Sequence, residues 1–111
     1  MRLYLEGSAL TIATLHDVAE ERRLQDEKWG PVQSIPNGTG PCTGRAFGVY
    51  RELLEEARLD NDEGEATFES VLAEEFCEAM LEDDPVKLRA ELVQVAAVAV
   101  KWIEHIDRRA P

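Results

Sequence analysis

Hydrophobic residues recur at intervals of three and four along most of the chain, which is the periodicity of amphipathic α-helices. Together with start and stop signals, this periodicity predicts helices at about 12–28, 45–58, 67–83 and 85–109. A chain of 111 residues is too short for two ordinary domains. We therefore expect an all-α protein, a four-helix bundle in which residues 1–111 form a single domain.

Local signals mark the ends of three of these helices. Thr11 or Thr14 is a candidate N-cap of the first helix, and Gly30-Pro31 stops it. Thr67 is placed to cap the third helix. Asp84-Pro85 supplies a hydrogen-bond acceptor at the N-cap and a proline at the first position of the fourth helix.

Three other stretches depart from a simple amphipathic pattern. Residues 30–44 hold four Gly and three Pro, which is too broken for regular structure, and long loops of this kind are often functional. The sequence LDNDEGE, residues 59–65, predicts an exposed acidic turn. LVQVAAVAV, residues 92–100, is apolar almost all round, so we expect a central helix that needs cover on every side and favours self-association.

Acidic residues dominate the charge of the chain, whose formal net charge is −11. Of 23 acidic residues, 15 fall between Glu52 and Glu91, where only Arg58, Lys87 and Arg89 oppose them. This surplus argues against duplex nucleic acid as a partner, because affinity there comes mainly from cations that meet phosphates. It suits a protein that collects divalent cations, although solubility alone explains many acidic surfaces.

Cysteine usage and hydropathy indicate a cytoplasmic protein without a membrane partner. Cys42 and Cys77 have no CxxC spacing and no secretory context, so we expect two free thiols in a reducing compartment. The N-terminal residues lack the pattern of a signal peptide. The longest wholly apolar run, residues 95–100, is far too short to span a membrane.

Carboxylates at helical spacing are the strongest candidates for a chemical site. Glu75 and Glu78 are three residues apart, so their side chains leave one face of the third helix about one turn from each other. Glu91 and Gln94 repeat this spacing on the fourth helix. If the two helices pack antiparallel across the tight turn at 82–85, these side chains converge into an oxygen-rich cluster that suits Mg²⁺, with Mn²⁺ as an alternative.

Two considerations bear on this cluster. Gln94 stands among apolar residues, where an unpaired amide would cost about 1–3 kcal/mol, so we expect it to have a partner. The competing interpretation is that Glu75 and Glu78 are solvated residues at the edge of an amphipathic helix.

Polar residues on the first and fourth helices are candidates for substrate contacts. Arg22, Gln25 and Trp29 lie within about 60° on a helical wheel, and nucleobase recognition uses such a flat ring beside hydrogen-bonding groups. A core role for Trp29 is an equal alternative. Lys101 continues the polar stripe of Glu91 and is placed to meet a polyphosphate, or is simply a surface lysine.

Three stretches carry a resemblance to a known family. Residues 74–78 read EEFCE, residues 91–94 read ELVQ, and residues 21–30 read ERRLQDEKWG. They resemble the MazG-like all-α nucleoside triphosphate pyrophosphohydrolases, whose pattern is EExxE on one helix and ExxD on the next. The family's aspartate falls on Gln94, whose carbonyl can still ligate Mg²⁺ but adds no negative charge.

The resemblance implies hydrolysis of a nucleoside or deoxynucleoside triphosphate to the monophosphate and pyrophosphate, as in nucleotide-pool cleaning, by a homodimer or a dimer of dimers. It implies a metal site of Glu75, Glu78, Glu91 and Gln94. Within this mechanism we expect Glu74 to activate water and Lys101 to hold phosphate charge. The residues expected to contact the substrate are Arg22, Gln25, Lys28 and Trp29.

Two other functions fit the same residues. One is a non-catalytic helical module for binding or regulation, which has lost turnover through Gln94. The other is a pyrophosphohydrolase that keeps the metal but acts on another nucleotide metabolite. Pyrophosphate release from a panel of nucleotides distinguishes these alternatives.

Overall fold

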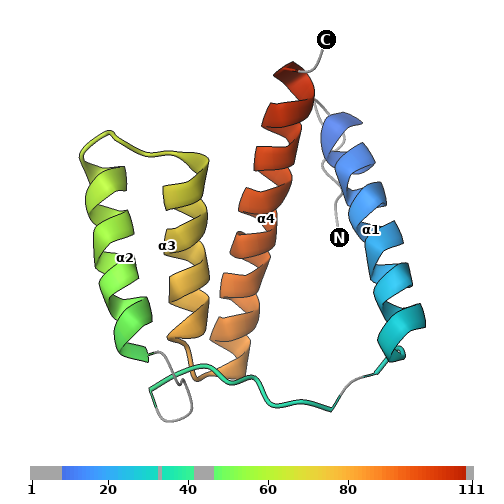
Figure 1. The fold of residues 1–111 in the computed structure, drawn as a ribbon, viewed down its shortest axis with the longest axis horizontal. Coiled ribbons are helices and arrows are strands. Elements are labelled where there is room, and N and C mark those ends of the chain that lie inside the picture. Colours follow the sequence, from blue (N-terminus) through green and yellow to red (C-terminus); the bar gives the residue numbers. More distant parts are fainter. Residues whose placement is uncertain (1–8, 33, 42–46, 110–111) are drawn as a thin grey trace. The chain divides into compact units, whose positions relative to one another are not determined.

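The structure is a computed structural model that describes residues 9–32, 34–41 and 47–109 (Figure 1). These residues contain no strand, which confirms the predicted all-α class. Their helices are α1 (Ala9–Trp29), α2 (Phe47–Asp62), α3 (Phe68–Met80) and α4 (Pro85–Arg109). Within the same ranges, no helix is long and apolar enough to cross a membrane.

The chain divides into two compact units. One comprises residues 1–36 and 100–111, and the other comprises residues 37–99. The second unit contains α2, α3 and the first part of α4, and with them the candidate metal ligands. That residues 1–111 act as one domain stays a prediction.

In the second unit, α2 and α3 pack side by side, and the contact between them forms a seam (Figure 1). The buried hydrophobic residues on this pair of helices are Leu54, Ala57, Cys77 and Ala79. Tyr50 and Phe76 meet edge to face, with ring centroids 5.8 Å apart. Cys77 is a free thiol, as predicted, whereas Cys42 lies outside the described residues.

Thr67 caps α3, as its position in the sequence predicts. Its hydroxyl accepts a hydrogen bond from the Ser70 N–H at 3.0 Å, while the Thr67 N–H donates to the Ser70 hydroxyl at 2.9 Å. This reciprocal pair is a capping box, and it satisfies backbone donors that the first turn of a helix leaves free. The Ser70 hydroxyl in turn donates to Asn61 of α2 at 2.7 Å, which joins the cap to the seam.

Helix α3 ends at Met80, three residues earlier than predicted, where the preceding loop hydrogen-bonds to the carbonyl of Met80 and to one just beyond it. The Gly40 N–H donates to the Met80 carbonyl at 2.9 Å, and the Thr39 hydroxyl donates to the Glu82 carbonyl at 2.7 Å. Gly40 has a φ of 87°, and a Cβ there would overlap the Asp83 carboxylate. The positive φ favours glycine at this position, and a larger residue would also require the Asp83 side chain to move.

Helix α2 continues to Asp62, so the acidic turn predicted at residues 59–65 is mostly helical. After Asp62 the chain turns at Gly64, whose φ of 77° suits glycine, and the Glu65 N–H donates to the Asp60 carbonyl at 3.0 Å. This bond and the positive φ of Gly64 are features of a Schellman helix C-terminus. The predicted first residues of this helix, 45 and 46, lie outside the described residues.

Helix α4 begins at Pro85, as predicted. The Asp84 carboxylate accepts the Lys87 N–H at 3.0 Å, and the Asp84 carbonyl accepts the Leu88 N–H at 2.8 Å. The expectation that its middle is central is wrong for the single chain. Leu92 and Val93 are 45% and 53% exposed.

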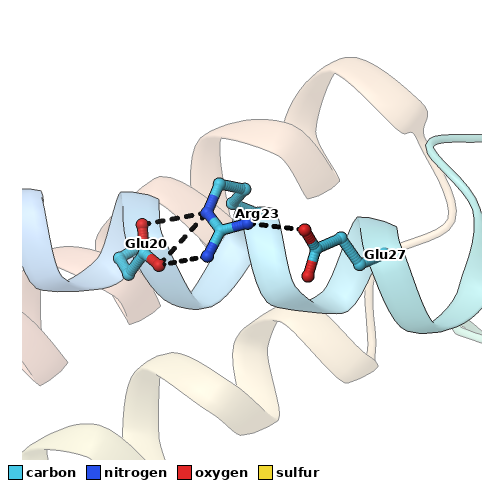
Figure 2. A network of polar contacts seen from close by, with 3 residues as sticks. All are labelled: Glu20, Arg23 and Glu27. Atoms are coloured by element: carbon cyan, nitrogen blue, oxygen red, sulfur yellow. Dashed lines mark hydrogen bonds and ion pairs between the residues drawn. The ribbon is translucent and has the colours of Figure 1, made fainter.

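In the other unit, α1 begins at Ala9, so Thr11 and Thr14 lie inside the helix and do not cap it. The Thr11 hydroxyl instead donates to the Glu104 carboxylate near the end of α4 at 2.9 Å. Arg108 lies 3.6 Å from the same buried carboxylate. On the exposed side of α1, Arg23 bridges Glu20 and Glu27, one turn away on either side (Figure 2).

The predicted Gly/Pro-rich loop is irregular wherever it is described, at residues 30–32 and 34–41. The Gly30 N–H donates to the Asp26 carbonyl at 2.8 Å, which completes the last turn of α1. The remainder of the predicted loop, residues 33 and 42–44, lies outside the described residues.

The capping box yields a prediction about stability. Thr67→Ala removes the acceptor for the Ser70 N–H, and loss of such an N-cap typically costs about 1 kcal/mol. We expect the free energy of unfolding to fall by about this amount in urea denaturation. Asp17→Ala, at an exposed position inside α1, is the control and should cause no loss, because alanine favours a helix interior more than aspartate does. Equal stability of the two variants would contradict the assigned role of Thr67.

Candidate metal centre

Three carboxylates from two helices meet in the unit of residues 37–99. Glu75 and Glu78 extend from one face of α3, and Glu91 extends from the second turn of α4. One oxygen of each residue lies within 4.8 Å of the others, and all three side chains are half-buried. The four-residue connection between Met80 and Pro85 turns α4 back along α3, so the antiparallel arrangement expected from the sequence brings the three together.

The surroundings of the cluster disfavour its charged form. Burial raises the pKa of Glu75 above its ordinary value of 4.5, and the carboxylates of Glu91 and Glu74 raise it further. The pKa of Glu78 is raised mainly by burial and then by Glu75. A hydrogen bond from Arg58 lowers the pKa of Glu78 part of the way back, and Glu91 raises it again. Negative charge is therefore concentrated here with little compensation.

Two buried oxygens of the cluster also lack hydrogen-bond donors. Glu75 Oε2 and Glu91 Oε2 are inaccessible to solvent and have no partner among the described residues. Buried polar atoms in native proteins are nearly always paired, because a bare carboxylate oxygen in the interior is costly. A divalent cation would satisfy both oxygens and would offset the repulsion. Mg²⁺ fits this donor set, since it binds a few carboxylates and keeps several waters.

A second row of contacts runs between α2 and α3, beside the cluster. The Arg58 guanidinium lies 3.3 Å from Glu78 Oε1, and the Asn61 amide donates to Glu74 Oε1 at 2.8 Å. Glu74 and Glu78 are one turn apart on α3, and their partners are one turn apart on α2. Glu78 therefore belongs both to the carboxylate cluster and to the seam, whereas Glu74 faces α2.

The contribution of α2 was not predicted from the sequence. Leu54, Ala57, Arg58 and Asn61 follow the i, i+3, i+4, i+7 spacing of one helix face. The first two are buried against α3 and the last two carry its polar contacts. This spacing indicates one face of a helix, but the sequence does not show that this face packs against α3.

Gln94 is exposed on α4, three residues after Glu91. The expectation that apolar neighbours bury its amide is wrong for the single chain, because those neighbours are themselves exposed. Its amide has access to water and does not need a protein partner. Lys101, the residue expected to hold phosphate charge, is also exposed on α4.

The four residues expected to contact a substrate lie near the end of α1. Arg22, Gln25 and Trp29, with Asp26, line a cleft of about 290 Å³. Arg22 donates to Gln25 and to Asp26, both at 2.9 Å, and the Lys28 ammonium lies 4.9 Å from the centre of the Trp29 ring. Trp29 is 54% exposed, so it is not a core residue of this chain.

The chain has no significant match among profiles of known protein families, curated protein sequences or solved structures. The described residues form four helices and no strand, with an acidic cluster of Glu75, Glu78 and Glu91.

The raised pKa values make the stability of the metal-free protein depend on pH. A carboxyl group with a higher pKa in the folded chain binds more protons when folded, so the free energy of unfolding falls as pH rises from 4.5 through the raised values. Glu75→Gln removes one such group. Above that window we expect it to stabilise the metal-free protein by a few tenths of a kcal/mol, since like charges one helical turn apart repel by about this much.

Thermal unfolding followed by circular dichroism across this pH range, in the presence of a chelator, measures the effect. The variant should show a shallower pH dependence than the wild type. Glu55→Gln removes an exposed carboxylate from α2 and should keep the wild-type pH dependence. If Glu75→Gln behaves like Glu55→Gln, the cluster carries no significant repulsion.

Proposed function

We propose that this chain is a Mg²⁺-dependent pyrophosphohydrolase that converts a nucleoside or deoxynucleoside triphosphate to the monophosphate and pyrophosphate. The observation that carries the proposal is the convergence of Glu75, Glu78 and Glu91, two of whose buried carboxylate oxygens have no hydrogen-bond partner among the described residues. The resemblance of EEFCE and ELVQ to the MazG-like pattern supports the same chemistry. Mn²⁺ is an alternative ion for this donor set.

The reaction replaces one phosphorus–oxygen bond by another. The oxygen of a water molecule forms a bond to the α-phosphorus, and the bond from that phosphorus to the α,β-bridging oxygen breaks, so pyrophosphate leaves. Mg²⁺ on Glu75, Glu78 and Glu91 would offset phosphate charge and orient the water. Without a cation, these three carboxylates would repel a polyphosphate.

Glu74 is the proposed base for the attacking water. Its Oε1 accepts the Asn61 amide at 2.8 Å, and this contact fixes the orientation of the carboxylate. We assign the proton to Oε2. Glu74 precedes the metal ligand Glu75, so a base at this position stays close to the proposed metal.

The α1 cleft is the proposed site for the base of the nucleotide. An exposed Trp29 ring offers a stacking surface, and each stacked base typically gains about 1–3 kcal/mol. Gln25 would read the edge of the base, while Arg22 and Lys28 would meet phosphate charge, as would Lys101 of α4. Arg22 would first have to exchange its present partners, Gln25 and Asp26, for the substrate.

Self-association, as a homodimer or a dimer of dimers, is part of the proposal. Leu92 and Val93 on α4 are about half exposed, and a partner that covers them would bury apolar surface. Duplex nucleic acid is a poor partner for a chain with a net charge of −11.

One observation favours a second candidate, a non-catalytic binding or regulatory module. Gln94 stands where the MazG-like pattern has an aspartate, and it leaves the cluster with three carboxylates. Such a module would bind the metal, or a nucleotide with the metal, without turnover.

Pyrophosphate release from common and modified nucleotides, with and without Mg²⁺, tests the proposed activity. Wild-type protein should release pyrophosphate only with the metal. Glu75→Gln and Glu78→Gln should lower the rate by about 100-fold or more, because even outer-shell partners of a metal are typically worth about 10- to 100-fold. Glu55→Gln is the matched control and should retain the wild-type rate. If the wild-type protein releases pyrophosphate from none of the nucleotides, the proposed enzymatic activity is wrong and the binding module is the remaining candidate.

Gln94→Asp tests whether the second motif is a weakened metal ligand. An added carboxylate should tighten Mg²⁺ binding by about tenfold, which is about 1.4 kcal/mol, because ligand charge sets the affinity of such sites. Isothermal titration calorimetry measures the change. Ala19→Asp adds the same charge at an exposed position of α1, instead of on the apolar face of α4, and should have little effect. An unchanged affinity in Gln94→Asp would show that residue 94 does not face the ion.

A further inference from the structure

Arg58 is the one cation that the described residues place in contact with the carboxylate cluster. Its Nη2 atom lies 3.3 Å from Glu78 Oε1, across the seam between α2 and α3. Charge-assisted hydrogen bonds are usually about 2.7–2.9 Å long, so this contact is loose. The Arg58 side chain is 53% exposed and that of Glu78 is 22% exposed, so the guanidinium approaches the cluster from its solvent side.

The backbone of Arg58 is held more firmly than the tip of its side chain. Leu54 and Ala57, on the same face of α2, are buried against α3 and fix the register of the two helices. Asn61, one turn further along, adds hydrogen bonds to Ser70 and Glu74. The packing therefore fixes the backbone position of Arg58, while its long, half-exposed side chain can change its hydrogen-bond partner.

The charge of a metal-bound polyphosphate gives Arg58 a second partner. A divalent cation on the three carboxylates would reduce the attraction of Glu78 for the guanidinium. A nucleoside triphosphate carries more negative charge than one divalent ion offsets, and a guanidinium binds phosphate oxygens through two parallel N–H groups. The contact with Glu78 is loose and single, so it leaves other N–H groups for a phosphate.

We propose that Arg58 is a phosphate-binding residue of this site that exchanges Glu78 for a phosphate of the substrate when the metal binds. The proposal rests on the metal-dependent function proposed above. It gives Arg58 two effects of opposite sign. Before the substrate arrives, Arg58 competes with the metal for the negative charge of Glu78. Once the metal is bound, Arg58 attracts the phosphates.

The contrast with Asn61 supports this assignment. Asn61 and Arg58 of α2 occupy corresponding positions, since each contacts one glutamate of α3: Asn61 contacts Glu74, and Arg58 contacts Glu78. A neutral amide is enough to orient the carboxylate of Glu74 across the seam. A guanidinium at the position next to the metal ligand adds a positive charge that packing does not require.

Two binding measurements on the full chain separate the two effects. The first is the affinity for Mg²⁺ alone by isothermal titration calorimetry. The second is the affinity for imidodiphosphate, a pyrophosphate analogue that resists hydrolysis, in saturating Mg²⁺. For Arg58→Gln we expect Mg²⁺ to bind about threefold more tightly, because a half-exposed competing charge is gone. Imidodiphosphate should bind about tenfold more weakly, because a charge-assisted hydrogen bond is lost.

Arg51→Gln is the matched control. Arg51 lies two turns before Arg58 on α2, is exposed, and lies 5.9 Å from the centre of the Phe47 ring. Its loss changes the net charge equally and should shift neither affinity. Arg58→Lys retains the positive charge, so it should leave Mg²⁺ affinity near the wild-type value and recover part of the imidodiphosphate affinity.

The outcomes distinguish this proposal from the one on which it rests. Weaker Mg²⁺ binding in Arg58→Gln would show that Arg58 only supports the structure, and unchanged imidodiphosphate affinity would show that it does not bind phosphate. Either result overturns the role of Arg58 and leaves the metal-dependent function standing. A wild-type chain that binds neither Mg²⁺ nor Mn²⁺ would overturn both proposals.

Discussion

Repulsion among three half-buried carboxylates is the constraint around which the unit of residues 37–99 is organised. Neither α3 nor α4 alone brings Glu75, Glu78 and Glu91 within 4.8 Å; the short connection between the helices does. Hydrogen bonds hold that connection in place at both of its ends. Thr39 and Gly40 bind carbonyls at the end of α3, and Asp84 caps the start of α4. Hydrogen bonds outside the cluster, from both backbone and side chains, therefore hold the two helix ends together against this repulsion.

Features set by local chemistry were predictable from the sequence. Thr67 and Asp84 cap their helices with groups only three residues away, so their roles follow from the neighbouring sequence alone. The convergence of Glu75, Glu78 and Glu91 needed one further assumption, an antiparallel turn, and the Asp84-Pro85 pair made that assumption reasonable. The all-α class followed from the spacing of apolar residues along the whole chain.

Features set by distant parts of the chain were not predictable. The end of α3 at Met80 involves a hydrogen bond from Gly40, which is 40 residues away. Helix α2 continues through the predicted acidic turn as far as Asp62, where Asn61 is hydrogen-bonded to Ser70 and Glu74. Gln94 was misjudged for a related reason. Its apolar neighbours suggested burial, but hydrophobicity does not say whether the covering surface comes from the same chain. The role of Arg58 depends likewise on which residue of α3 lies opposite.

The position of Glu78 in both the cluster and the seam limits how small a fragment can reproduce the site. A hairpin of α3 and α4 transplanted into another protein would carry all three carboxylates, but it would leave behind the cation that faces one of them and the buried residues that hold that cation in register. Any graft or minimal mimic of this cluster therefore needs three helical segments, because α2 supplies the positive charge that faces Glu78 as well as packing support.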